Sequence, residues 1–228
     1  AVVGAVNIAA YQVCFFAGVA RTGVAVGTIV AIGSAPAIAG IAAWAVRRER
    51  PERGWTTATL LAVAGCSLLL APAGDAATVD PLGVLLALAS GAGYASYTLA
   101  SKVLLDAGCR PSAAMAVAFS GAAVLLAPVV ARADLSWLAT SRGVGMVLWL
   151  SVVTTAGAYV LYARGLGRLP AATVASLTLG EPLIAGLIGV LLLGERPGLL
   201  AALGAVLVAG GLVWLAARRP ATPTPPPG

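Results

Sequence analysis

The sequence predicts an all-α membrane protein of about eight transmembrane helices, and three observations lead to this fold class. Of the 228 residues, 60% are apolar and only 10% are charged, whereas a soluble globular chain carries roughly 25% charged residues. Eight apolar runs are each long enough to cross the hydrocarbon core, which takes about 20 residues in a helix. The runs are continuously apolar, without the alternation that a membrane β-barrel requires.

The predicted spans follow one another along the chain, and short connectors between them hold nearly all of the charge. They cover residues 1–20, 23–46, 54–72, 81–105, 110–131, 142–164, 170–193 and 197–217. The proline-rich segment 218–228 cannot form a regular helix, so we expect a disordered tail there. No basic segment precedes the first run, so we do not expect this run to be a signal peptide, and we expect the chain to begin inside a longer protein.

The distribution of basic residues predicts the orientation in the membrane. One side of the membrane receives ten of them: Arg47, Arg48, Arg50, Arg53, Lys102, Arg110, Arg164, Arg168, Arg218 and Arg219. The other side receives four, which are Arg21, Arg132, Arg142 and Arg196. Because cytoplasmic connectors carry the excess of Lys and Arg, we expect the first side and the C-terminus to be cytoplasmic, in the inner membrane of a bacterium.

Several function classes are disfavoured by what the sequence lacks. It contains no histidine, and its three cysteines are too scattered for a metal motif or a disulfide framework. We therefore expect no catalytic residues, no metal and no cofactor. The net charge of +6 is explained by arginines that flank the spans, so nucleic acid is not an expected partner. No nucleotide-binding motif of the GxxxxGK[ST] type is present.

An internal repeat becomes visible when the chain is shifted by 146 residues. Pro36 then falls on Pro182, and the Glu-Arg-Pro segment 49–51 falls on the Glu-Arg-Pro segment 195–197, without gaps. The two copies lie five spans apart, an odd number, so they should be upside down relative to each other. Inverted repeats around a site at the membrane midplane are typical of secondary transporters.

The repeat predicts how the chain is divided. Residues 1–72 form a partial first repeat of three helices, residues 81–217 form a second repeat of five helices, and residues 218–228 form the disordered cytoplasmic tail. Position 1 corresponds to position 147, so the first copy lacks its opening two spans.

Two segments resemble a known family. The segment from Tyr162 reads YARGLGRLPAATVASLTLGEPLIAGLIGVLLLGERPGLLAALGAVLVAGG, and the segment from Phe16 reads FAGVARTGVAVGTIVAIGSAPAIAGIAAWAVRRERP. Both resemble parts of the EamA domain of the drug/metabolite transporter superfamily, and Glu-Pro followed 13 residues later by Glu-Arg is the most specific feature. The resemblance implies two inverted EamA repeats, ten helices in full-length members, of which this chain would lack the first two.

The resemblance also implies a function. We expect a secondary transporter that moves a small metabolite or drug across the inner membrane by alternating access, coupled to protons or to exchange. The expected partners are this small molecule, the lipid bilayer and protons, and homodimerisation stays open. Two alternatives remain, a truncated membrane scaffold without transport activity and a membrane-embedded enzyme.

The most distinctive residue is Glu181, in the middle of the apolar run 170–193. A charge at a helix centre costs about 2.5–3.5 kcal/mol on insertion scales, so this carboxyl should face a wet cavity or a partner, or stay protonated. Pro182 has no N–H, and we expect the Thr178 carbonyl to lack its partner and to join the Thr178 hydroxyl and the Glu181 carboxyl in an acceptor cluster. Glu181 is then a proton-coupling site or an anchor for a substrate ammonium, or else a structural carboxyl that fixes the kink.

Polar side chains recur at helical spacing in three spans, which places each set on one helix face. The sets are Asn7, Tyr11 and Cys14 in the first span, Ser90, Tyr94, Tyr97 and Ser101 in the fourth, and Ser151, Thr155, Tyr159 and Tyr162 in the sixth. Such faces can line a cavity, or they can hydrogen-bond between helices for about 0.6 kcal/mol each. Near the cytoplasmic end, an interfacial aromatic belt is a further explanation.

These arguments define a predicted substrate site between the two halves. Its residues are Glu181, Thr178, Tyr11, Asn7, Ser34, Tyr94, Tyr97, Thr155 and Tyr159. Pro36 and Pro182 interrupt matching positions of the two halves and are the predicted kinks or hinges.

Overall fold

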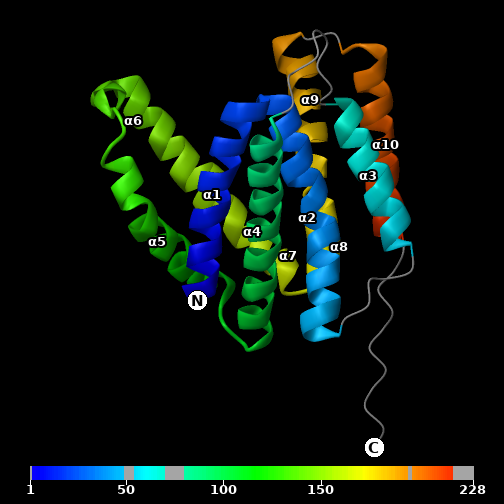
Figure 1. The fold of residues 1–228 in the computed structure, drawn as a ribbon, viewed down its shortest axis with the longest axis horizontal. Coiled ribbons are helices and arrows are strands. Elements are labelled where there is room, and N and C mark those ends of the chain that lie inside the picture. The colour runs from blue at the N-terminus through cyan, green and yellow to red at the C-terminus, as the bar shows by residue number, and fades with distance from the viewer. Residues whose placement is uncertain (1, 49–53, 70–79, 195–196, 218–228) are drawn as a thin grey trace, which may run out of the picture.

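The computed structural model describes residues 2–48, 54–69, 80–194 and 197–217, and all regular structure in these segments is helical (Figure 1). The elements are α1 (Val2–Thr22), α2 (Val24–Arg47), α3 (Trp55–Leu69), α4 (Pro81–Asp106), α5 (Pro111–Val130), η1 (Ser136–Ala139), α6 (Ser141–Leu148), the π-helix η2 (Trp149–Gly157), α7 (Ala158–Leu166), α8 (Ala171–Leu177), α9 (Gly180–Leu193) and α10 (Leu199–Ala217).

The predicted fold class is confirmed. Within the described residues, seven stretches are long and apolar enough to cross a membrane, with α6, η2 and α7 counted as one stretch and α8 with α9 as another. The eighth predicted span corresponds to α3, an apolar helix of 15 residues. The predicted tail at 218–228 and the connector that carries Arg50 and Arg53 lie outside the described residues.

Helix α4 is the centre of the bundle, and α1 and α2 pack along it. In its apolar window 50% of the residues are buried, against 33% or less in the other six spans. Glycines allow the close approach, since a Cβ on Gly18 would lie 3.0 Å from the Gly83 carbonyl oxygen. Carboxylates at the two ends of α4 hold the last turns of its neighbours: Asp80 pairs with Arg21 of α1 at 3.1 Å, and Asp106 pairs with Arg47 of α2.

A second packed pair consists of α3 and α10. A Cβ on Gly65 would lie 2.6 Å from the Gly204 carbonyl oxygen, and a Cβ on Gly211 would lie 2.8 Å from the Ala58 carbonyl oxygen. A shift of 146 residues carries Gly65 to Gly211 and Ala58 to Gly204, so it exchanges the two contacts. Two repeats related by a two-fold axis would make this pattern, and the repeat itself stays a prediction.

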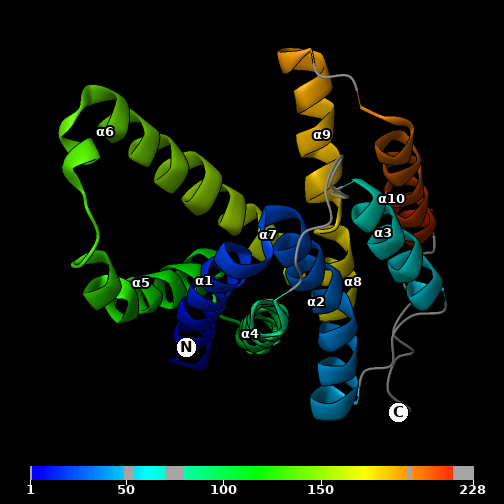
Figure 2. The ribbon, with the colours of Figure 1, turned by 45° about the horizontal axis from the view of Figure 1, so that its top comes forward.

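Two of the predicted spans are not regular α-helices. The sixth contains the π-helix η2, and the seventh is interrupted at Thr178 and Leu179, where α8 ends and α9 begins after a turn. In Figure 2, α6 and α9 diverge from the region of α7 and α8 like the arms of a V. None of the apolar window in the stretch from Ser141 to Leu166 is buried, so this arm packs little against the rest of the bundle.

Candidate functional site

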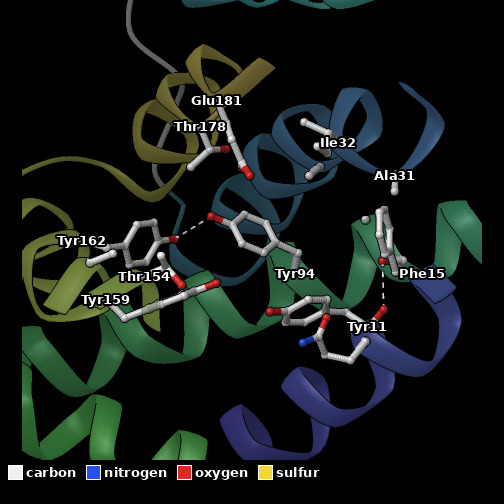
Figure 3. Close-up of a pocket in the computed structure, with 15 residues that line it drawn as sticks. Tyr11, Phe15, Ala31, Ile32, Tyr94, Thr154, Tyr159, Tyr162, Thr178 and Glu181 are labelled. Carbon is white, nitrogen blue, oxygen red and sulfur yellow. Dashed lines mark hydrogen bonds between the residues drawn. The ribbon is translucent and has the colours of Figure 1, made fainter. Parts of the chain in front are cut away.

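A cavity of about 740 Å³ lies where α1, α2, α4, η2, α7 and the α8–α9 turn meet (Figure 3). Its lining residues are Tyr11, Gln12, Phe15, Ala31, Ile32, Ala35, Ser90, Gly91, Tyr94, Thr154, Ala158, Tyr159, Tyr162, Thr178 and Glu181. Of these described lining residues, only Glu181 is charged. The volume is more than twenty times the roughly 30 Å³ that one water molecule occupies in the liquid, so the cavity is large enough for a small solute.

The broken seventh span positions Glu181 in this cavity. Glu181 is the second residue of α9 and the eleventh of the 22-residue span Ala171–Leu192, so it lies at the middle of the membrane stretch. It is the only acidic residue of the sequence that lies away from a span end. The helix dipole favours a negative side chain in the first turn of α9.

The expected acceptor cluster at the break needs a correction. The Thr178 carbonyl is not free, because it accepts the Glu181 N–H at 3.0 Å in a tightened turn. The Thr178 hydroxyl donates to the Ala175 carbonyl at 2.8 Å and can still accept. Pro182 is the third residue of α9, a first-turn position where its missing N–H leaves no bond unmade. The helix is therefore broken before Pro182, at residues 178–179. Of the three expected acceptors, only the Thr178 hydroxyl and the Glu181 carboxyl face the cavity.

All five tyrosines of the chain form one cluster beside the cavity. Tyr97 lies in its centre, stacked against Tyr162 with 15° between the rings, and Tyr94 and Tyr159 are within 6.5 Å of it. Tyr11 meets Tyr94 edge-on at 6.0 Å. Four of these rings line the cavity, while Tyr97 is fully buried behind them. The cavity therefore has a carboxyl on one wall and aromatic faces with hydroxyl groups on the other (Figure 3).

Hydrogen bonds between these rings close one end of the cavity. The Tyr94 hydroxyl donates to the Tyr162 hydroxyl at 3.3 Å, and Thr98 bonds the Tyr162 hydroxyl at 2.8 Å. The next residues along α4 and α7, including Thr98 and Leu166, are fully buried. Among the described residues, these rings and buried side chains separate the cavity from the C-terminal end of α4.

An ion-pair cluster lies farther along the closed end. Lys102 pairs with Asp106 at 3.0 Å one turn along α4, and Asp106 also pairs with Arg47. The Lys102 ammonium reaches the Gly167 carbonyl at 3.5 Å, just after α7. Lys102 is 9% exposed, so it is more than a flanking residue of the span, and the cluster joins α2, α4 and α7 at this end.

The cavity lies between equivalent positions of the two predicted repeats. The 146-residue shift relates Ile32 to Thr178 and Ala35 to Glu181, and all four residues line the cavity. Each position is apolar in the first copy and polar in the second. The carboxyl is therefore not required by the fold of the repeat, which favours a role in binding.

The structure brings together five of the nine residues predicted for the substrate site: Tyr11, Tyr94, Tyr159, Thr178 and Glu181. A sixth, Thr155, lines a smaller adjoining pocket. The remaining three lie outside the cavity lining. Asn7 donates to the Val3 carbonyl at 2.8 Å, Ser34 donates to the Ala31 carbonyl at 3.2 Å, and Tyr97 donates to the Met115 sulfur at 3.0 Å. A substrate contact for any of the nine residues stays a prediction.

Gln12, Phe15 and Thr154 are among the lining residues that the predicted substrate site did not include. Gln12 is a polar residue inside an apolar run, and this pattern could have identified it as a lining residue. The sequence contains no comparable signal for Phe15. Thr154 lies next to the predicted Thr155, and the π-helix is the reason that it faces the cavity: the Thr154 and Thr155 hydroxyls both donate to the Leu150 carbonyl, at 2.7 and 2.8 Å. A π-turn carries an extra residue, which shifts the face that the α-helical spacing predicts.

A chamber at mid-membrane, enclosed by several spans and closed at one end, defines a multi-pass membrane transporter. The chain belongs to the EamA-like transporter family, whose match covers residues 81–217. This membership confirms the resemblance of the segment from Tyr162, and it places the protein among transporters and not among enzymes. The division into two repeats stays a prediction.

Comparison with relatives gives the same family. YwfM of Bacillus subtilis (strain 168), described as an uncharacterized transporter, is 45% identical over 213 residues, which are 93% of this chain and 71% of YwfM. The threonine/homoserine exporter RhtA of Escherichia coli (strain K12) is 34% identical over 163 residues, 70% of this chain and 54% of RhtA. A solved crystal structure shares the fold, with a TM-score of 0.82 at 20% identity over 95% of this chain and 75% of that chain.

Proposed function

We propose that this protein is a secondary transporter that carries a small metabolite with an ammonium group, such as an amino acid or an amine, across the bacterial inner membrane. The observation that carries the proposal is the single carboxyl, Glu181, in a cavity whose opposite wall is formed by tyrosine rings. A carboxylate pairs with an ammonium group, and aromatic faces attract cations within about 6 Å of the ring centre. The threonine/homoserine specificity in the name of RhtA fits this substrate class.

Alternating access follows from the position of the cavity between the halves. Equivalent residues of the two predicted repeats line it, and rocking of one repeat against the other would open it to each side in turn. With the orientation predicted from the basic residues, the tyrosine-closed end and the Arg47–Asp106 pair face the cytoplasm. The described conformation is then open towards the outside, and the C-terminus lies in the cytoplasm.

A proton gradient or exchange would supply the driving force. Glu181 can bind either a proton or a substrate ammonium, but not both at once, so the two ligands would compete for one group. Competition of this kind couples proton entry to substrate exit without any further site. No second acidic residue lies inside a span, which makes Glu181 the single candidate for the coupling.

Flux into proteoliposomes tests this function. The protein would be supplied with threonine, homoserine, other amino acids and simple amines, with and without a pH gradient. We expect counterflow of one or more of these solutes, accelerated by the gradient, and we expect Glu181→Gln to lose the pH dependence while it stays folded. Asp134→Asn is a matched control, because Asp134 lies in a connector and outside the cavity lining.

Two results would contradict the proposal. If no ammonium-bearing solute shows counterflow, the substrate class is wrong. If Glu181→Gln keeps wild-type pH-driven flux, the proton-coupling role is wrong even though transport itself stands.

A further inference from the structure

A smaller pocket of about 280 Å³ adjoins the cavity between α1, α5 and η2. Its lining residues are Ile8, Tyr11, Gln12, Phe119, Ala122, Ala123, Leu126, Thr155 and Tyr159. We call it the side pocket. None of these residues carries a charge, and the hydroxyl of Thr155 already donates to the Leu150 carbonyl at 2.8 Å.

The side pocket and the main cavity share three residues, Tyr11, Gln12 and Tyr159. The Tyr11 and Tyr159 side chains are within hydrogen-bonding reach of each other, so they form the threshold between the two spaces. Both rings line the main cavity together with Glu181. A molecule held at the carboxyl can therefore extend across the threshold.

The walls of the two spaces differ in chemistry. Glu181 and Thr154 line the main cavity. Beyond its threshold the side pocket is lined by aliphatic side chains, by Phe119, whose ring meets Tyr159 at 4.5 Å, and by Thr155, whose hydroxyl proton is donated to the Leu150 carbonyl. The π-helix η2 creates part of this division, because it directs the neighbours Thr154 and Thr155 into different spaces. Apolar groups leave water favourably for such a wall, at roughly 0.8 kcal/mol per buried methylene.

We propose that the side pocket is a second subsite, which binds the apolar side chain or alkyl group of a substrate whose ammonium lies at Glu181. The inference rests on the proposed function and adds substrate selectivity to it. The main cavity selects for the positive charge. The side pocket selects for the size of the apolar group, and Gln12 and Tyr159 contact the atoms that join the two ends.

Binding of an alkylammonium series measures this directly. Methyl-, propyl- and pentylammonium would be titrated by calorimetry against the whole chain in nanodiscs. In the wild type we expect affinity to rise about fourfold for each methylene that enters the pocket, which is the fold-change equivalent of the transfer energy per methylene. Ala122→Leu should flatten this rise, because the new side chain fills the pocket. Glu181→Gln should weaken all three probes alike.

Two further variants keep the test decisive. Ala122 is 2% exposed, and a leucine there could prevent folding. Ala123→Leu is then the second filling variant, since Ala123 lines the pocket but is exposed. Ala116→Leu is the matched control: it is the same substitution two turns away on the same face of α5, outside both spaces.

The outcomes separate the two proposals. The subsite is supported if affinity rises with the length of the alkyl chain in Ala116→Leu but not in Ala122→Leu or Ala123→Leu. Absence of the rise in the wild type, an unchanged rise in the filling variants, or no binding of any probe overturns it. Counterflow of threonine and amines in the same preparations reports independently on transport, so a bound but untransported series would contradict the proposed function and not the subsite.

Discussion

Helix α2 and the α8–α9 pair occupy equivalent places in the two predicted repeats, yet they differ in continuity. Both contain a proline at the matching position, Pro36 and Pro182, but α2 continues from Val24 to Arg47 without interruption, whereas the other copy is broken at residues 178–179. The proline alone therefore does not break the helix.

The difference between the copies lies in the residues before the proline. The broken copy places Thr178 and Glu181 where α2 has Ile32 and Ala35. Hydroxyls at Ser176 and Thr178 donate to backbone carbonyls one turn earlier, and such bonds compete with the helical pattern. One copy supplies an apolar wall and the other supplies the polar groups, so the asymmetry of the pair, and not the repeat itself, gives the cavity its chemistry.

Moving the carboxyl from one copy to the other is the strongest test of this comparison. Charge-assisted hydrogen bonds contribute roughly 1.5–3 kcal/mol, so Glu181→Ala should weaken propylammonium binding roughly 10- to 150-fold. Adding Ala35→Glu should restore most of the affinity, because both positions line the same cavity. Calorimetric titration compares the single and double variants. If the folded double variant binds as weakly as the single one, the two positions are not interchangeable.

Restoring a backbone donor at each proline tests whether the break matters for turnover. Pro182→Ala offers the Thr178 carbonyl a regular α-helical N–H in place of the Glu181 N–H that it accepts in the tightened turn, and one backbone hydrogen bond contributes about 0.5–1.5 kcal/mol. We expect counterflow to slow by up to about tenfold, with substrate affinity nearly unchanged. Pro36→Ala is the matched control in the continuous helix and should leave the rate close to wild type. Equal effects of the two variants would show that the break has no special role.

The contacts of α3 and α10 test the two-fold relation away from the cavity. Gly211→Ala would place a Cβ 2.8 Å from the Ala58 carbonyl oxygen, and Gly65→Ala would place one 2.6 Å from that of Gly204. Overpacking of this kind costs typically about 1–3 kcal/mol, so thermal unfolding should show a lower Tm for both variants. Gly210→Ala has open space around its Cβ and should not lower the Tm. A lower Tm in only one of the two variants, Gly211→Ala or Gly65→Ala, would argue against the equivalence of the two contacts.

The smallest effect is expected at the N-terminal end of α4, where Asp80 stabilises the fold and does not line the cavity. The Arg21 guanidinium and the Leu82 N–H hold the pKa of Asp80 below its usual value. A depressed pKa means that the stabilisation is present above the unfolded value of about 3.9 and is lost as the pH falls through the folded value. Asp80→Asn keeps the N-cap and should lower the Tm slightly at pH 7 and by less at pH 3. An equal decrease at both pH values would mean that the charge plays no part.

The sequence was sufficient for the helical fold because each span is a long apolar run, and length and composition decide whether such a run crosses a bilayer. The π-helix could not be predicted, since the hydroxyls of Ser151, Thr154 and Thr155 give no local signal for an extra residue in the turn. For the site, Glu181 stood out because a charge inside an apolar run is costly. Ala35 and Phe15 did not, because an apolar lining residue has the same appearance in a sequence as a lipid-facing one.

The gathering of every tyrosine at one place has a practical consequence. A reagent that nitrates or iodinates phenol rings can modify this chain only within this one tyrosine cluster, four of whose five rings line the cavity. Mass spectrometry of the tryptic peptides would then report occupancy directly, with a bound solute shielding Tyr11 or Tyr159 while buried Tyr97 serves as the internal reference. The tyrosines of the native protein can thus serve as footprinting sites, and no engineered probe is needed to measure occupancy of the cavity.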